Sequence, residues 1–215
     1  MLHSVVAKVT ENILLRSQAI RESYLDNLSG TINNYPPRKS LSCSNLAHSF
    51  ASAAFNEKNI LVRSGKPNVA IISAYNDMLS AHKPYEDYPK KLRKYFLKLG
   101  ATCQVAGGVP AMCDGVTQGK PGMELSLFSR DLIAMSTAVS LSHNAFDAIV
   151  GLAICDKIVP GMLMGALKFG YLPFMFIPSG PMPSGISNAK KSKVRQQYAE
   201  GKASEEELLT IETAA

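Results

Sequence analysis

Cys155, Asp156 and Lys157 place a thiol, a carboxylate and an amine on three consecutive residues. A thiolate binds soft iron, whereas a carboxylate binds a hard cation such as Mg²⁺. At the end of a strand, the tripeptide would hold an iron centre beside a divalent ion. An isolated Cys-Asp-Lys also arises by chance, so this interpretation depends on the longer context Cys-Asp-Lys-Ile-Val-Pro-Gly-Met-Leu-Met.

A second segment with chemical potential is the glycine-rich run over residues 107–119, Gly-Gly-Val-Pro-Ala-Met-Cys-Asp-Gly-Val-Thr-Gln-Gly. Glycines let a loop approach a ligand closely and leave backbone N–H groups free to bind it. Asp114 lies inside the run and is able to ligate a cation, or alternatively to make an ordinary turn hydrogen bond. The run is not a phosphate-binding Walker loop, because no Gly-Lys-Ser/Thr closes it.

The four cysteines are Cys43, Cys103, Cys113 and Cys155, and no two of them form a Cys-x-x-Cys pair. This spacing argues against a zinc ribbon and against a thioredoxin-like motif. The N-terminus lacks a basic segment followed by a long apolar run, so we expect no export signal, a cytoplasmic protein and no disulfide framework. Ligation of a metal or cluster from separate loops stays open, as does simple burial of the thiols.

The elements that must position these groups alternate along the middle of the chain. Apolar runs predict strands at residues 69–74, 101–106, 147–155 and 172–177. Steps of three and four predict helices between them, including one carried by apolar residues at 125, 128, 132, 135 and 139. We therefore predict an α/β fold, a parallel sheet covered by helices on both faces and preceded by an N-terminal helical segment.

Three regions follow from this pattern. Residues 1–66 form the N-terminal helical segment, with a helix over 1–28, a loop over 29–39 and a short helix over 41–55 that Ser42 or Ser44 would cap. Residues 67–186 form the α/β domain, and residues 187–215 form a charged helical tail.

The loops after the predicted strands carry the polar side chains. They contain Tyr-Asn-Asp (75–77), Cys-Asp-Gly (113–115), Cys-Asp-Lys (155–157) and Ser-Gly-Pro (179–181). Ligands of open parallel sheets bind at the carboxyl ends of the strands. The sequence therefore predicts the chemistry at this edge of the sheet.

Composition restricts the partners. With 23 Lys+Arg against 17 Asp+Glu in 215 residues, the chain carries a net charge of +6. The excess suits an anionic small molecule and is too diffuse to indicate nucleic acid, while the basic residues at 83–98 are typical of a solvated helix face. We expect no membrane span, because four prolines interrupt the longest uncharged stretch, residues 169–189.

Six motifs in order closely resemble the family of dihydroxy-acid and phosphogluconate dehydratases, at residues 73–85, 107–119, 122–130, 141–144, 155–161 and 178–182. The forms Asn-Asp-Met-Leu-Ser-Ala-His and Ala-Met-Cys-Asp-Gly-Val-Thr are similar to the phosphogluconate branch. The resemblance implies dehydration of 6-phospho-D-gluconate, a sugar-acid phosphate, to 2-dehydro-3-deoxy-6-phosphogluconate in the Entner–Doudoroff pathway. It also implies a homo-oligomer at full length.

The same resemblance implies cofactors. Cys155 matches a ligand of the family's 4Fe-4S cluster. In the dihydroxy-acid branch, the aspartates matching Asp114 and Asp156 bind Mg²⁺ together with a carbamylated lysine that matches Lys157. His82 and Ser179 are candidates for contact with the substrate. The alternatives are a helix cap for His82 and, equally well supported, a plain turn for Ser179.

Two departures from the family pattern stand out. Ala81 occupies the place of a cluster cysteine of the dihydroxy-acid branch, and we favour Cys113 over Cys43 as its replacement, the alternative being that Cys113 is an ordinary loop thiol. The family's later Gly-Thr-Cys-Thr motif and its catalytic base would follow Ala215. We therefore expect an N-terminal fragment that is inactive alone and holds no catalytic base. A dehydratase of another sugar acid or dihydroxy acid, or an inactive remnant, are the alternatives.

Overall fold

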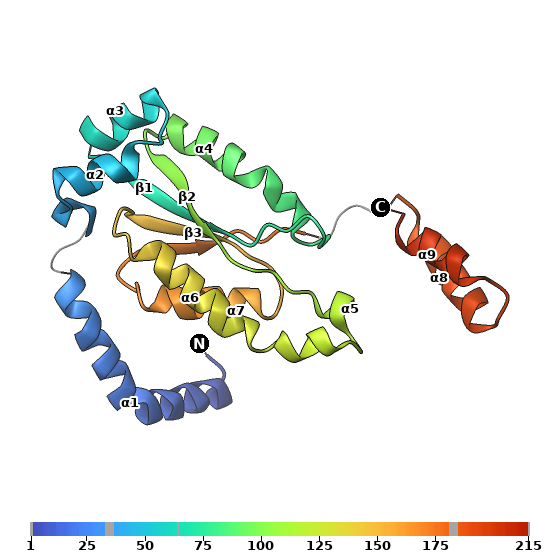
Figure 1. The fold of residues 1–215 in the computed structure, drawn as a ribbon. Helices are drawn as coiled ribbons and strands as arrows, with labels where there is room; N and C mark the ends of the chain where they lie inside the picture. The colour runs from blue at the N-terminus through green and yellow to red at the C-terminus, as the bar shows by residue number, and fades with distance from the viewer. Residues whose placement is uncertain (1, 33–36, 64, 181–184, 215) are drawn as a thin grey trace.

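The computed structural model describes residues 2–32, 37–63, 65–180 and 185–214. Within them, four strands form one parallel sheet: β1 (Asn68–Ser73), β2 (Thr102–Gly108), β3 (Ala148–Leu152) and β4 (Phe174–Phe176). Their order is β2-β1-β3-β4, so the first strand of the chain lies inside the sheet (Figure 1). All four predicted strands exist, with bounds that differ from the prediction by a few residues.

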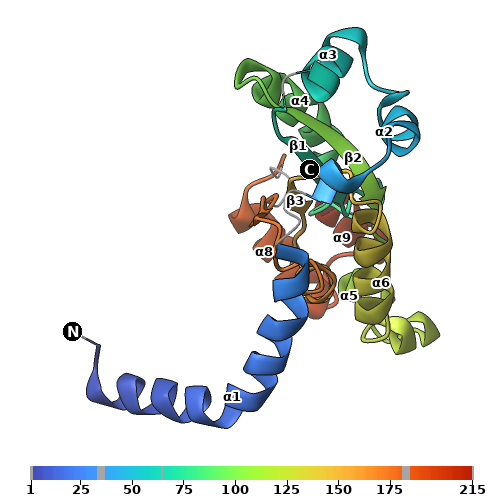
Figure 2. The same cartoon turned by 90° about the vertical axis from the view of Figure 1, so that its left-hand side faces the viewer.

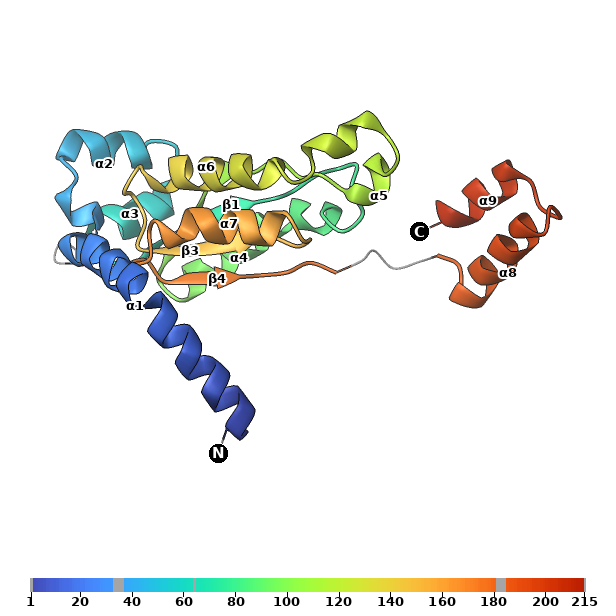
Figure 3. The same ribbon diagram turned by 90° about the horizontal axis from the view of Figure 1, so that it is seen from below.

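Helices cover both faces of this sheet. Helix α4 (Tyr88–Lys98) lies on one face, and α6 (Ser129–Leu141) and α7 (Ile158–Leu167) lie on the other (Figures 1 and 3). Strand β1 contributes side chains to the cores on both faces of the sheet. Val69 and Ile71 lie in the core beneath α4, whereas Ala70 and Ile72 lie in the core beneath α6 and α7. Complete burial of such an aliphatic side chain stabilises the fold by about 1.5–3 kcal/mol. The predicted α/β class is confirmed.

Shorter elements connect these layers. Ser42 begins α2 (Cys43–Phe50) as its cap, since its Oγ accepts a hydrogen bond from the Asn45 backbone N–H at 3.2 Å. The other connecting elements are η1 (Pro37–Ser40), α3 (Phe55–Arg63), η2 (Lys83–Glu86), α5 (Asp114–Thr117) and η3 (Pro121–Leu125). The helix predicted over 41–55 is thus shorter, and a second helix follows it.

The first helix, α1 (Ser4–Ile32), contacts the α/β layers near its end. The Tyr24 hydroxyl donates to the Leu167 carbonyl of α7 at 2.9 Å, and Leu28 is buried. Residues 2–23 are exposed apart from Ser17, and Figure 2 shows this part of the helix standing away from the sheet.

Helices α6 and α7 pack closely through small residues. A Cβ atom added to Gly161 would lie 2.9 Å from the Arg130 carbonyl oxygen, and one added to Gly165 would lie 2.6 Å from that of Ala134. The buried face of α6 consists of Ser129, Ile133, Thr137, Ser140 and Leu141. The apolar residues at 125, 128, 132, 135 and 139, from which the sequence predicted this helix, are exposed and lie off that buried face. The buried face includes small side chains such as Thr137, against which the glycines of α7 pack.

The tail consists of α8 (Asn188–Ala199) and α9 (Glu205–Glu212), which pack against each other beyond the carboxyl end of β4 (Figures 1 and 3). Arg195 pairs with Glu212 across them. The division into regions 1–66, 67–186 and 187–215 stays a prediction. Among the described residues, we find no helix both long and apolar enough to cross a bilayer.

Candidate functional site

The site lies at the carboxyl edge of the sheet, where the loops after β2 and β3 meet. Lys157, directly before α7, donates from Nζ to Asp156 Oδ2 at 2.8 Å and also to Asp114 Oδ2. The Ser126 hydroxyl donates to the other oxygen of Asp114, Oδ1, at 2.7 Å. Parallel strands end at one edge, so residues 43 positions apart in the chain become neighbours, as the sequence predicts.

Charge pairing favours the ionised forms of Asp114 and Lys157. The hydrogen bond from Lys157 lowers the pKa of Asp114, and Ser126 lowers it further. The Asp114 carboxylate in turn raises the pKa of Lys157, with Asp156 adding to the effect. Although Lys157 is only 8% exposed, its ammonium is therefore charged at neutral pH. One cation lies between two carboxylates, which leaves one net negative charge.

Cys155 lies beside this trio in an uncommon backbone conformation, with φ at 81°. Burial raises the pKa of its thiol, and the neighbouring Cys113 thiol and Asp156 raise it further. Cys113 directly precedes α5, and the loops after β2 and β3 bring the two thiols near enough to interact electrostatically. The other two thiols lie elsewhere: Cys43 is exposed on α2, and Cys103 is buried in the core under α4, where its pKa rises to about 11.

These donors fit the implied cofactors only in part. The part of the chain that the structure describes contains no group of three or more His, Cys, Asp or Glu side chains arranged for a metal ion. Two thiols are fewer than the four cysteines that usually hold a 4Fe-4S cluster. The two carboxylates suit a hard cation such as Mg²⁺, provided that the ammonium between them loses its charge.

The two predicted substrate contacts, His82 and Ser179, are held by the protein's own backbone. His82 is 1% exposed, its Nδ1 lies 2.8 Å from the Ala74 carbonyl oxygen, and its buried Nε2 has no hydrogen-bond partner among the described residues. The Ser179 hydroxyl donates to the Ala81 carbonyl. Both residues lie at the predicted edge, and their contact with substrate stays a prediction. Pro181 lies outside the described residues.

Tyr85 is a residue that the sequence reasoning missed. Its side chain is fully buried, its hydroxyl donates to the Ile177 carbonyl at 3.2 Å, and the Ser179 backbone N–H donates to that hydroxyl at 2.9 Å. Tyr85 therefore joins the loop after β1 to the loop after β4. Periodicity places Tyr85 among helical residues but carries no signal for a hydrogen bond across 92 positions.

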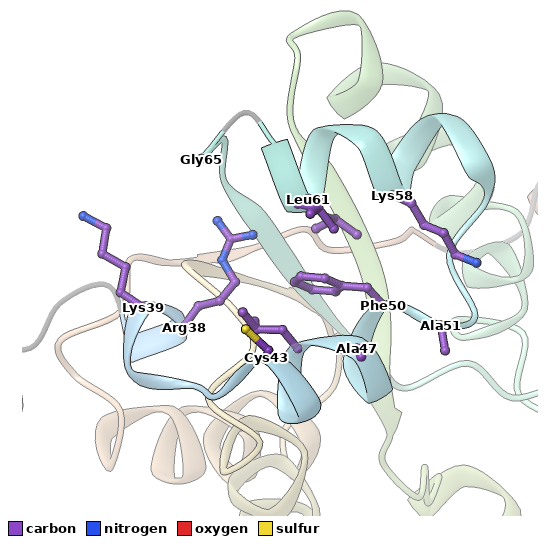
Figure 4. A pocket seen from close by; sticks show the side chains of 11 residues that line it. Arg38, Lys39, Cys43, Ala47, Phe50, Ala51, Lys58, Leu61 and Gly65 are labelled. Atoms are coloured by element: carbon purple, nitrogen blue, oxygen red, sulfur yellow. The ribbon is translucent and has the colours of Figure 1, made fainter.

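A pocket of about 560 Å³ lies away from this edge, between η1, α2 and α3 (Figure 4). Phe50 and Leu61 form part of its apolar wall, and Arg38 lies beside them with its guanidinium carbon 6.0 Å from the Phe50 ring centre. Arg38 also pairs with Asp147, which directly precedes β3, at 3.1 Å. The pocket is therefore at the amino end of the strands and is separate from the Asp114–Lys157 site.

Comparison with known proteins identifies the family of this chain. Residues 66–215 match the family model described as dihydroxy-acid/6-phosphogluconate dehydratase N-terminal. The chain is 55% identical over 214 residues to the phosphogluconate dehydratase of Pseudomonas aeruginosa, which covers 100% of the chain and 35% of that protein. It is 53% identical to the phosphogluconate dehydratase of Escherichia coli K12, covering 97% of the chain and 34% of that protein.

A dihydroxy-acid dehydratase of Akkermansia muciniphila is more distant, with 37% identity over 158 residues, covering 70% of the chain and 28% of that protein. The chain spans about a third of the length of the phosphogluconate dehydratases it matches. The family model covers well over half of the chain, in the same region that carries the carboxylate, lysine and thiol groups. This chain belongs to the dihydroxy-acid/6-phosphogluconate dehydratase family.

Proposed function

We propose that this chain supplies the carboxylate and thiol part of a phosphogluconate dehydratase site. The complete site would remove water from 6-phospho-D-gluconate and give 2-dehydro-3-deoxy-6-phosphogluconate, the reaction of the Entner–Doudoroff pathway. Identities of 53–55% to two phosphogluconate dehydratases support 6-phosphogluconate as the substrate. The dihydroxy-acid dehydratase of Akkermansia muciniphila is only 37% identical, which makes a dihydroxy acid the weaker candidate. The contact of Lys157 with Asp114 and Asp156 is the observation that carries the proposal.

In this proposal, the trio holds a divalent cation after the Lys157 amine is carbamylated. Carbamylation adds CO₂ to the neutral Lys157 amine, so the ammonium releases two protons in all and becomes a carbamate anion. Three anionic groups with oxygen donors then face one another, instead of two carboxylates and a cation. Asp114 is already oriented by Ser126, which reduces the freedom that the carboxylate loses on binding a metal. A Mg²⁺ ion held there would supply positive charge for the substrate's carboxylate end and for the negative charge that develops on loss of the C2 proton.

Cys155 and Cys113 are the proposed thiol ligands of a 4Fe-4S cluster in the complete site. When bound, such a cluster supplies a Lewis-acidic iron for the departing hydroxyl group. Two thiols leave the ligand set incomplete, so at least one further ligand and the base are required from outside these residues. The positive φ of Cys155 supports a role for this residue, because a cysteine seldom adopts that conformation without a local requirement.

The test joins this chain to the part of the Pseudomonas aeruginosa relative that follows its matched segment. After anaerobic reconstitution, we expect the chimera to convert 6-phosphogluconate to its 2-oxo product. Asp156→Asn should lower turnover by more than about 100-fold, because it removes an anionic ligand. Asp131→Asn, which changes an exposed carboxylate on α6, is the matched control and should leave turnover unchanged.

Two results would contradict the proposal. A chimera that carries its cluster, as measured by absorbance, but turns over no substrate would indicate an inactive remnant. A chimera that prefers a branched dihydroxy acid or an unphosphorylated sugar acid would assign the chain to another dehydratase of the family.

A further inference from the structure

The segment that follows β4, residues 177–179, uses every hydrogen-bond donor that it has on the protein itself. The Ile177 backbone N–H donates to a carbonyl of β3 at 2.9 Å, and the middle residue is a proline, which has no N–H. The Ser179 N–H donates to the Tyr85 hydroxyl at 2.9 Å, and the Ser179 hydroxyl donates to the Ala81 carbonyl. The segment therefore offers a ligand hydrogen-bond acceptors and no donors.

The hydroxyl oxygen of Ser179 is the side-chain acceptor of this segment. A serine hydroxyl has one donor and two acceptor lone pairs. Because the donor of Ser179 is used on the Ala81 carbonyl, its Oγ atom is left to accept. Ser179 is partly exposed, so a ligand can reach it. Such an oxygen suits a hydroxyl group of a ligand, and it has no hydrogen bond to donate to a carboxylate or a phosphate.

Tyr85 is fixed by the core of the protein and in turn fixes this segment. Its side chain is fully buried beneath α4, and its ring meets the Tyr88 ring edge to face, with 5.3 Å between the ring centres. The Tyr85 hydroxyl donates to the Ile177 carbonyl at 3.2 Å and accepts from the Ser179 N–H. A buried hydroxyl is costly to leave without partners, so these two bonds hold Ser179 in one orientation.

These contacts border the candidate site. Strand β1 lies between β2 and β3, so the loop that leads to Tyr85 begins between the loops that carry Cys113 and Cys155. The Ala74 N–H, directly after β1, donates at 3.0 Å to the Leu152 carbonyl at the end of β3. Burial raises the pKa of Tyr85, and the Cys155 thiol is near enough to raise it further. Tyr85 therefore fixes a part of the same edge at which the carboxylates and thiols gather.

We propose that Tyr85 is a positioning residue of the dehydratase site, which holds Ser179 so that its Oγ accepts a hydrogen bond from a hydroxyl group of the substrate. The inference rests on the proposed function, because 6-phosphogluconate supplies such hydroxyl groups. Its C3 hydroxyl leaves in the reaction and its C2 hydroxyl becomes the oxo group. The hydroxyls at C4 and C5 are therefore the groups that Ser179 would recognise, and the two anionic ends of the substrate are left to cationic groups.

The test measures binding to the reconstituted chimera by isothermal titration calorimetry. The ligand 3-deoxy-6-phosphogluconate lacks the hydroxyl that leaves, so it binds without reacting, and two dideoxy analogues lack the C4 or the C5 hydroxyl as well. We expect Ser179→Ala to raise the Kd of 3-deoxy-6-phosphogluconate by about 10-fold, the effect of one lost hydrogen bond. Ser179→Ala should leave the Kd of one dideoxy analogue unchanged, because that analogue has already lost the contact, and should weaken the other by the same factor.

Tyr85→Phe keeps the buried ring and removes only the hydroxyl. We expect it to weaken the same ligands as Ser179→Ala, and to have no further effect when the two changes are combined, because it acts through Ser179. Tyr88→Phe is the matched control, since the Tyr88 hydroxyl makes no hydrogen bond among the described residues although its ring contacts Tyr85. The Tyr88→Phe chimera should bind every ligand like the wild type.

Circular dichroism verifies that each variant is folded, and Ser179→Ala alone decides if Tyr85→Phe is not. Equal weakening of all three ligands by Ser179→Ala, or of none, would overturn the proposal, because a general disturbance of the site does not distinguish one hydroxyl from another. A Tyr85→Phe chimera that binds every ligand like the wild type would overturn the role of Tyr85. A wild-type chimera that does not bind 3-deoxy-6-phosphogluconate would instead contradict the proposed substrate, and this inference with it.

Discussion

Single side chains in this protein show how burial and pairing decide protonation. Lys157 is buried next to two carboxylates, which raise its pKa and keep it charged. His82 is buried next to a carbonyl group, and burial lowers its pKa even though the hydrogen bond to Ala74 acts in the opposite direction. Burial thus leaves Lys157 charged, because two carboxylates lie beside it, and favours the neutral form of the His82 ring, which has no carboxylate partner among the described residues.

His82 makes stability depend on pH. Its pKa in the folded protein is below that in the unfolded chain, so the unfolded state binds more protons as pH falls below about 6.5. The contribution of His82 to stability is therefore complete above that pH and decreases as pH falls toward the folded-state pKa. We expect His82→Asn, which retains a donor toward the Ala74 carbonyl, to reduce this loss of stability.

Urea unfolding at pH values on both sides of about 6.5 measures the effect. His143→Asn is the matched control, because His143 contacts the Ser140 carbonyl through Nδ1 at 3.0 Å but lies on the surface. An unchanged pH dependence in His82→Asn would show that the imidazole is not the group responsible.

At the scale of elements, the contact between α6 and α7 depends on glycine. A Cβ atom at Gly165 would lie 2.7 Å from Thr137 Cβ and 2.6 Å from the Ala134 carbonyl oxygen, neither of which is the end of a flexible side chain. We expect Gly165→Ala to lower the free energy of unfolding by about 1–3 kcal/mol, because the helices must separate. Gly180→Ala, where nothing lies within 4 Å of the added atom, is the control in the same urea experiment.

The elements also show what the sequence can and cannot predict. Periodicity identifies α6, and a continuous apolar run identifies β1. The rule for parallel sheets places Asp114 near Lys157 from the order of strands and loops alone. Periodicity does not say which face of α6 is buried, because the glycines that select the smaller face belong to α7. The role of Tyr85 is equally hidden, since it depends on the carbonyl of Ile177.

At the scale of the whole molecule, α1 divides into a free part and an anchored part. Its last third contacts the α/β layers, through the Tyr24 hydroxyl and the buried Leu28. We expect removal of residues 1–20 to leave the free energy of unfolding unchanged, because these residues bury almost no surface. Removal of residues 1–29 should destabilise the protein, because it uncovers the end of α7 around Gly170. Equal destabilisation by both truncations would contradict this division.

The positive φ of Cys155 means that the residue best suited to function at this position is not the one that would make the protein most stable. At most positions, glycine is less stable than alanine by about 0.5–1 kcal/mol because glycine loses more freedom on folding. At the φ of 81° of Cys155, a protein with glycine should be more stable than one with alanine, because the Cβ atom is itself the source of the strain. Cys155→Gly should therefore unfold at a higher urea concentration than Cys155→Ala, although neither variant retains the thiol. A residue that carries sulfur where glycine would fit better identifies a position that the fold alone would not have chosen.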